Sequence, residues 1–125
     1  MGFEVIEVPG LPPPGQFTHV AKKGKMVFIS GQTANRAAES GNLDPDRQAE
    51  EVFFYLKSAI EAAGGDMLDI VKINIFLTDL SQFPAILDWR PKYFTQPYPA
   101  ATCVVVDSMV RRDLIMEIEA IAILD

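Results

Sequence analysis

Residues 45–63 form the longest periodic stretch of this sequence, and they predict an amphipathic helix that constrains the rest of the fold. Asp44 and Pro45 are typical of a helix start, and Gly64-Gly65 of a helix end. A helix with one apolar stripe must bury that stripe against another element. The stripe follows the i, i+3, i+4, i+7 spacing of a helix and consists of Ala49, Val52, Phe53, Leu56, Ile60 and Ala63.

Most of the remaining segments resemble strands. Three short segments are rich in β-forming residues, namely residues 3–8, 17–21 and 26–30. Gly24 can supply the turn of a hairpin between the last two of these segments. Residues 33–45 are expected to form a polar loop. Residues 70–78 alternate, which predicts a half-buried strand with Val71, Ile73, Ile75 and Leu77 on one face. Residues 97–106 and 114–122 predict two further strands.

A second helix is expected to begin after Asp79 or Ser81 and to break or kink near Arg90, because the ring of Pro91 would clash with the carbonyl of Leu87. The order β-β-β-α-β-α-β-β predicts one α+β domain over residues 1–125, with a mixed sheet of about six strands and two helices on one face. The other face also carries apolar residues, and no element remains to cover it. We therefore expect a homo-oligomer.

Composition excludes several classes of function. The net charge of −6 disfavours a nucleic-acid partner, which requires a basic surface. One cysteine and one histidine provide neither a disulfide framework nor a zinc site. No apolar run approaches the roughly 20 residues of a membrane helix, and no signal peptide is visible, so we expect a cytoplasmic protein with no membrane partner.

The last predicted strand carries two carboxylates, Glu117 and Glu119, which share one face with Ile115 and Ile121. Their Cβ atoms would lie roughly 7 Å apart. Because an unpaired buried carboxylate is costly, the two acids should be hydrogen-bonded, solvated at a cleft, or placed at a subunit interface.

Taken together, several segments resemble the RidA/YjgF family of enamine/imine deaminases over nearly the whole chain. The segments are residues 15–19, 27–32, 62–65, 70–72, 76–79, 99–100 and 117–122, with Phe83. The resemblance implies a chorismate-mutase-like α+β fold and a homotrimer with an inner barrel and clefts between subunits. It also implies hydrolysis of a small-molecule enamine or imine to a carbonyl product and ammonia, without metal or cofactor.

The resemblance also assigns site residues. Glu117 would orient the water, and the substrate-binding positions would be Phe17, Ser30, Gly31, Leu87, Ala101 and Cys103. The chain is a divergent member, because Ala101 stands where the family typically has the arginine that binds the substrate carboxylate. A methyl group cannot replace a guanidinium. Arg111 or Arg112 could supply a replacement contact, so Arg112 is included among the binding residues.

Each assignment has a structural alternative. Glu117 could be an acid bonded to backbone amides, Cys103 a small buried hydrophobe, and the Arg111-Arg112 pair a solvated turn. Two functions therefore stay open: an enamine/imine deaminase acting on an untypical substrate, and a non-catalytic trimer that binds a small molecule or a protein. Ribonuclease activity fits poorly, because the charge is negative and no histidine pair is available.

Overall fold

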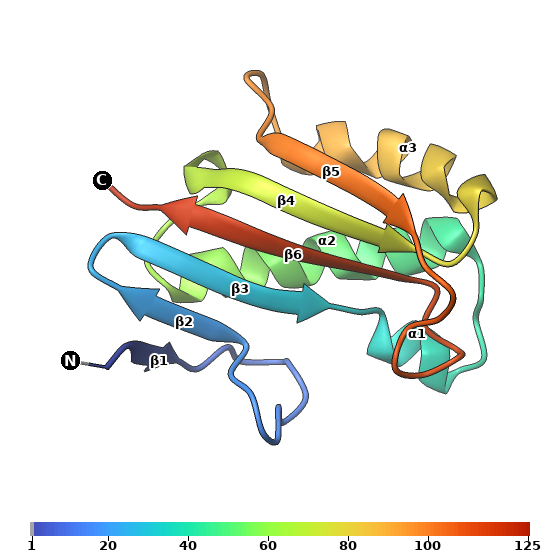
Figure 1. Ribbon diagram of the computed structural model, residues 1–125, viewed down its shortest axis with the longest axis horizontal. Helices are drawn as coiled ribbons and strands as arrows, with labels where there is room; N and C mark the ends of the chain where they lie inside the picture. Colours follow the sequence, from blue (N-terminus) through green and yellow to red (C-terminus); the bar gives the residue numbers. More distant parts are fainter. Residues whose placement is uncertain (1) are drawn as a thin grey trace.

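Six strands form one mixed sheet in the order β1-β2-β3-β6-β4-β5 (Figure 1). The computed structural model describes residues 2–125. The strands are β1 (Glu4–Ile6), β2 (Val20–Lys23), β3 (Met26–Gln32), β4 (Ile70–Leu77), β5 (Ala100–Val105) and β6 (Met116–Ile123). Neighbouring strands are antiparallel except β4 and β5, which are parallel. The predicted mixed sheet of the α+β fold is confirmed.

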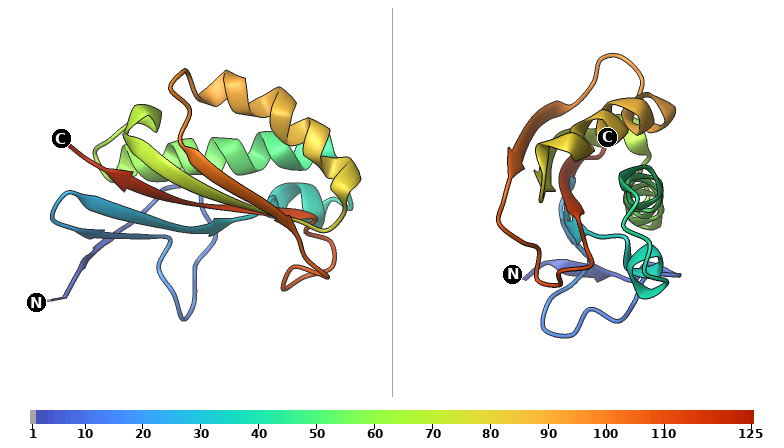
Figure 2. Two further views of the ribbon diagram at one scale, coloured as in Figure 1. Left: turned by 45° about the horizontal axis from the view of Figure 1, so that its top comes forward. Right: turned by 90° about the vertical axis from the view of Figure 1, so that its right-hand side faces the viewer.

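The helices lie on one side of this sheet, as the right-hand view of Figure 2 shows. The described residues form α1 (Asn35–Glu39), α2 (Pro45–Ala62) and α3 (Phe83–Tyr93), with short 3₁₀ turns at Met67–Asp69 and Leu80–Gln82. The two long helices, α2 and α3, are the two that the sequence predicts. No helix within residues 2–125 has both the length and the apolar character needed to cross a membrane.

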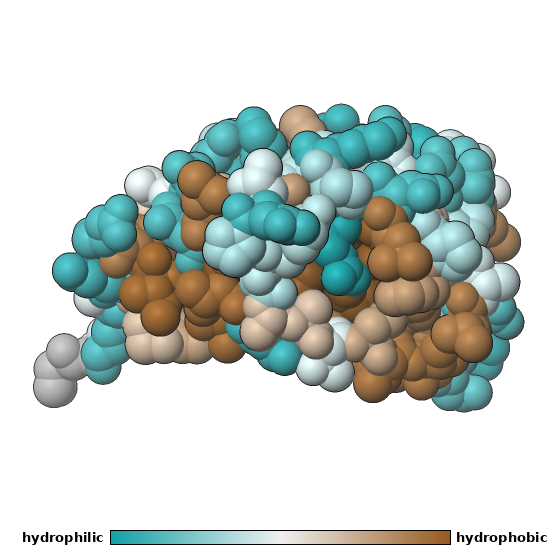
Figure 3. All heavy atoms as spheres, turned by 90° about the horizontal axis from the view of Figure 1, so that it is seen from above, coloured by the Kyte–Doolittle hydropathy of each residue, from teal (hydrophilic) through white to brown (hydrophobic). Residues whose placement is uncertain are grey.

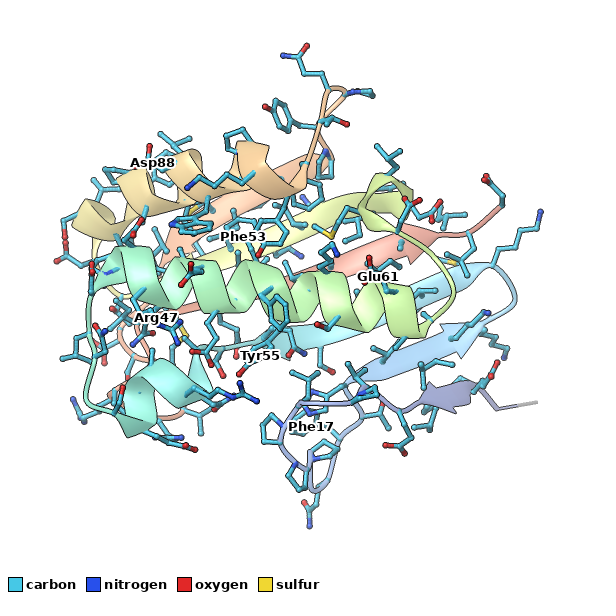
Figure 4. All side chains as sticks on the ribbon, turned by 180° about the vertical axis from the view of Figure 1, so that it is seen from behind. Phe17, Arg47, Phe53, Tyr55, Glu61 and Asp88 are labelled. Atoms are coloured by element: carbon cyan, nitrogen blue, oxygen red, sulfur yellow. The ribbon has the colours of Figure 1, made fainter. Side chains whose placement is uncertain are left out.

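Helix α2 has the predicted boundaries and the predicted buried stripe. Asp44 caps its first turn by accepting a hydrogen bond from the backbone N–H of Asp46, at 3.1 Å. At the other end Gly64 adopts a φ of +92°, and the N–H of Gly65 donates to the carbonyl of Ile60 at 3.0 Å. The six stripe residues are buried. Phe53 points from α2 towards the region between α2 and α3, where its ring stacks on Tyr93 (Figure 4).

The central strands β4 and β6 bury alternate residues against these helices. Ile73, Ile75 and Leu77 of β4 are fully buried, as are Met116 and Ile118 of β6. Leu114 and Ile115 are also buried, so the alternation of β6 begins only at Met116. The intervening residues of β4 and β6, including both glutamates, therefore face away from the helices.

The expected polar loop at 33–45 is wrong in part, because α1 occupies Asn35–Glu39. The cause is a contact that is distant in the sequence. The buried carboxylate of Glu51 accepts hydrogen bonds from the backbone N–H groups of Arg36 (2.8 Å) and Ala37 (3.0 Å). These bonds satisfy two free donors at the start of α1.

Three local predictions also need correction. The strand expected from Phe17 begins only at Val20. Val71 is 43% exposed rather than buried, because the pairing of β4 with β6 shifts register between Ile70 and Lys72 and Ile70 takes the buried position. Helix α3 does not break near Arg90 but continues past Pro91 to Tyr93. Pro91 lies in the last turn of α3, so only a short end of the helix has to accommodate its ring.

The face of the sheet that turns away from the helices is apolar at several places. Met26, Phe28, Val104 and Ile123 lie on this face and are 42%, 43%, 43% and 47% exposed. Figure 3 views the molecule from above and shows the apolar side chains gathered along its lower edge, where the outline is hollowed. We call this surface the open face.

Candidate active site

The central feature of the open face is the close approach of Glu117 to Gly31. Gly31 lies on β3 where its pairing with β6 shifts register between Ile29 and Gln32. A Cβ atom added to Gly31 would lie 2.5 Å from Cδ, 2.7 Å from Cγ and 2.9 Å from Oε1 of Glu117. The carboxylate therefore occupies the space that any side chain at position 31 would take.

Glu117 is half-buried, and the described residues make no hydrogen bond or ion pair with its carboxylate. Burial raises the pKa of this carboxyl above its usual value, and the charge of Glu119 raises it further. Glu119 differs, because its Oε2 accepts a hydrogen bond from Nδ2 of Asn74 at 3.0 Å. The two acids thus separate into a hydrogen-bonded carboxylate at position 119 and, at position 117, a carboxylate that receives no hydrogen bond from residues 2–125 and whose pKa is raised.

Ser30 precedes Gly31 on β3 and is hydrogen-bonded to the loop that carries Phe17. The hydroxyl of Ser30 donates to the carbonyl of Thr18 at 2.6 Å, and the Ser30 N–H donates to the carbonyl of His19 at 2.9 Å. These bonds hold residues 17–19 against β3. The ring of Phe17 is 51% exposed and meets the His19 ring edge-on, with 5.4 Å between centroids. We call Phe17, Ser30, Gly31 and Glu117 the carboxylate group.

The other predicted binding residues lie elsewhere in the fold. Cys103 pairs with Ile75, whereas Glu117 pairs with Phe76, the next residue of β4. Because successive strand residues point to opposite faces, Cys103 and Glu117 lie on opposite faces of the sheet. Ala101 shares the face of Cys103 and is exposed, and Leu87 of α3 is 51% exposed. We call Leu87, Ala101 and Cys103 the cysteine group.

Within one chain the sheet lies between Glu117 of the carboxylate group and Cys103 of the cysteine group. Figure 4 labels Phe17, on the loop between β1 and β2, at one edge of the molecule and Asp88, on α3, at the opposite edge. Strand β4 also lies between β5, which carries Cys103, and β6, which carries Glu117. A single chain therefore does not bring the predicted site residues together.

The environment of Cys103 favours the protonated thiol over the thiolate, which is the nucleophilic form of cysteine. Its side chain packs against the core, and burial raises the pKa of the thiol, an effect that the positive charge of Arg90 partly offsets. Arg90 was not among the predicted site residues. Nothing in the sequence distinguishes it from the solvated arginines that helices usually carry.

The loop between β5 and β6 carries Arg111 and Arg112, and both are exposed. Nη2 of Arg111 donates to Oδ2 of Asp113 at 2.7 Å in an exposed pair. The loop is fastened to α2 through Gln48, which donates to the carbonyl of Asp113 and accepts from the N–H of Ile115. Among residues 2–125, no group of three potential metal-ligating side chains gathers in one place.

This sheet order, with two long helices on one face and a carboxylate on the other, defines a small α+β protein of the chorismate-mutase-like fold. Comparison with known protein families identifies the family within this fold. The family profile described as Endoribonuclease L-PSP matches residues 10–124. The chain belongs to this family, the RidA/YjgF family of reactive intermediate deaminases.

Named relatives cover nearly the whole chain. A 2-iminobutanoate/2-iminopropanoate deaminase of Dermatophagoides farinae is 33% identical over 124 residues, which are 97% of this chain and 96% of the relative. The 3-aminoacrylate deaminase RutC of Acinetobacter baylyi is 32% identical over 127 residues, 98% of each chain. The crystal structure of RidA from an Antarctic Psychrobacter superposes with a TM-score of 0.86 at 35% identity, covering 97% of this chain and 99% of that one.

Proposed function

We infer that this protein hydrolyses reactive enamines or imines to a carbonyl product and ammonia, in clefts between the subunits of a homotrimer. The observation that carries this inference is the carboxylate of Glu117, which is half-buried over Gly31, without a partner among residues 2–125, and raised in pKa. A carboxylate in this state is suited to bind a water molecule and take a proton from it. The names of the two deaminase relatives support the same reaction class.

The reaction needs only water and one proton-transfer group. An enamine first moves a proton from nitrogen to carbon and becomes the imine. Water then adds to the imine carbon while Glu117 accepts one of its protons and passes it to the imine nitrogen, which gives a tetrahedral amino alcohol. Glu117 next takes the hydroxyl proton of this amino alcohol and delivers it to nitrogen as the C–N bond breaks, so that ammonia leaves, the carbonyl group forms and the carboxylate is unchanged. The sum is one imine and one water converted to one carbonyl compound and one ammonia.

The positions of the carboxylate group and the cysteine group support a cleft between subunits. Since Glu117 and Cys103 lie on opposite faces of the sheet of one chain, a second copy is needed to bring one group opposite the other. The open face provides an apolar surface for this association, with Met26, Phe28, Val104 and Ile123 exposed on it. Burial of such side chains favours association. We take the trimer from the family resemblance.

The test is the rate of imine hydrolysis above the uncatalysed background, with imines generated in situ from amines and amino acids by an oxidase. Glu117→Gln should lower kcat/KM by about 10²- to 10⁴-fold, the range for loss of a general acid–base group. Glu119→Gln is the matched control, because it removes a carboxylate two residues away on the same face whose hydrogen bond to Asn74 the amide can keep.

The wild type and both variants must be folded and have the same oligomeric state. If the wild type accelerates none of the imines, the deaminase function is wrong and the non-catalytic alternative takes its place. If Glu117→Gln and Glu119→Gln lose activity equally, the role of Glu117 is wrong. Ribonuclease activity is not part of this proposal, because the chain has a single histidine and a net charge of −6.

A further inference from the structure

Arg90 on α3 has a buried donor that nothing in the described chain satisfies. Its Nε atom is shielded from solvent and has no hydrogen-bond partner among residues 2–125. None of those residues forms an ion pair with its guanidinium. An unpaired buried donor is costly, and it is costlier when the donor belongs to a charged group. The position of Arg90 therefore needs an explanation.

Its place on α3 does not provide one. Arg90 and Lys92 both lie in the last turn of α3, where a positive charge is favoured by the helix dipole. Lys92 obtains this benefit from an exposed position, with Nζ 3.9 Å from the centroid of the Trp89 ring. The dipole does not require Nε of Arg90 to be withdrawn from water. An arginine side chain in this position could lie along the surface as Lys92 does.

The surroundings of Arg90 are those of the cysteine group. Leu87 precedes it by three residues and so lies on the same side of α3. Helix α3 runs beside β5 in Figures 1 and 2, and the charge of Arg90 acts on the thiol of Cys103 on that strand. Ala101 lies two residues before Cys103 on the same face of β5 and has only a methyl group.

We propose that Arg90 is the substrate-binding residue of the cysteine group and that it holds a carboxylate, so that the preferred substrates are anionic imines derived from amino acids. Arginine presents several N–H donors in a planar fork that fits the two oxygens of a carboxylate. Arg90 would thus supply from α3 the positive charge that Ala101 cannot supply from β5. This inference rests on the proposed function, because it assigns a substrate class to the same site.

The experiment compares wild type with Arg90→Gln, Arg90→Lys and Lys92→Gln on two substrates. One is the imine of a 2-amino acid, and the other is an imine of similar size without a carboxylate, both formed in situ. Arg90→Gln should lower kcat/KM for the anionic imine by about ten- to a hundredfold, through KM, and leave the neutral imine unchanged. Arg90→Lys should recover part of the loss, because lysine keeps the charge but not the fork. Lys92→Gln, which removes a charge from the same helix turn, should change neither substrate.

A binding measurement keeps this test independent of catalysis. Titration with 2-oxobutanoate, a 2-oxo acid, should give weaker binding to Arg90→Gln by the same factor, even if the protein turns over no imine at all. Equal losses on both substrates would show a structural role and overturn the proposal. So would dissociation of the Arg90 variants into monomers, which would make Arg90 a contact between subunits. Unchanged 2-oxobutanoate binding in Arg90→Gln would overturn it as well.

Discussion

Adding one methyl group at Gly31 tests the geometry of the proposed site without changing the chemical identity of Glu117. In Gly31→Ala the new Cβ would lie 2.5 Å from Cδ of Glu117. Carbon atoms in contact are ordinarily about 3.5 to 4.0 Å apart, so the carboxylate must move by about 1 Å. The backbone of Gly31 is not in the left-handed region, so alanine fits the chain itself.

The displacement should act on catalysis more than on stability. Overpacking of this kind costs about 1–3 kcal/mol of folding free energy. A shift of 1 Å in a catalytic group can cost about a hundredfold in rate. We therefore expect Gly31→Ala to remain folded, with kcat on any imine substrate reduced about a hundredfold and a modest loss of stability. Single-turnover and steady-state rates of imine hydrolysis, with urea unfolding, measure both effects.

The chain offers a matched control at Gly65. A Cβ atom there would lie 2.5 Å from Cδ2 of Leu124 and 2.8 Å from Oδ2 of Asp69, a similar crowding remote from Glu117. Gly65→Ala should lose stability to a similar extent and keep full activity. The reasoning is refuted if Gly31→Ala keeps full activity or loses no more activity than Gly65→Ala. Either result would mean that the position of the Glu117 carboxylate over Gly31 does not matter for the reaction.

Three further predictions concern stability and assembly. The raised pKa of Glu117 means that the folded protein holds this proton more tightly than the unfolded chain, so stability falls as pH rises from the usual glutamate pKa through the raised one. Glu117→Gln should therefore raise Tm at neutral pH and not in acid, and a Tm gain that is the same at both pH values would contradict the assignment. Gln48→Ala should cost about 3 kcal/mol in urea unfolding, because it leaves buried backbone groups of the β5–β6 loop unpaired; a loss below about 1 kcal/mol would count against this anchor. Phe28→Asp should convert the proposed trimer to folded monomers in light scattering, whereas Leu68→Asp, at another exposed apolar residue, should not; a trimer that survives Phe28→Asp would exclude the open face as the interface.

The sequence was sufficient for elements whose own pattern decides their structure. Helix α2 carries its cap, its stripe and its stop signal within one stretch, and the structure has all three. The sequence was insufficient where the local structure depends on a contact with a residue that is distant in the sequence. Helix α1 depends on the carboxylate of Glu51, and Val71 is exposed because of a shift in the pairing of β4 with β6. Neither cause is visible in the segment it changes.

The same distinction applies to the candidate site. The alternation of β6 correctly predicted that Glu117 and Glu119 share one face. It could not predict that Asn74 holds only Glu119, or that Gly31 makes room for Glu117, because both contacts depend on strand pairing. Arg90 was missed because an arginine on a helix gives no sign of whether its donors are buried. The unsatisfied Nε appears only once α3 is placed beside β5.

The proposed site is divided between subunits, and this division determines which form of the protein is active. If Glu117 comes from one subunit and Arg90 from another, neither side of the cleft can act alone, and the active species is the assembled trimer. Activity should then depend on protein concentration, and it should disappear on dilution below the dissociation constant of the trimer. The split also permits complementation. Glu117→Gln and Arg90→Gln chains mixed after dissociation should form some clefts with both wild-type residues, and activity on anionic imines should return. Activity that stays absent in verified mixed trimers would mean that both residues act within one chain, which their positions on opposite sides of the sheet argue against.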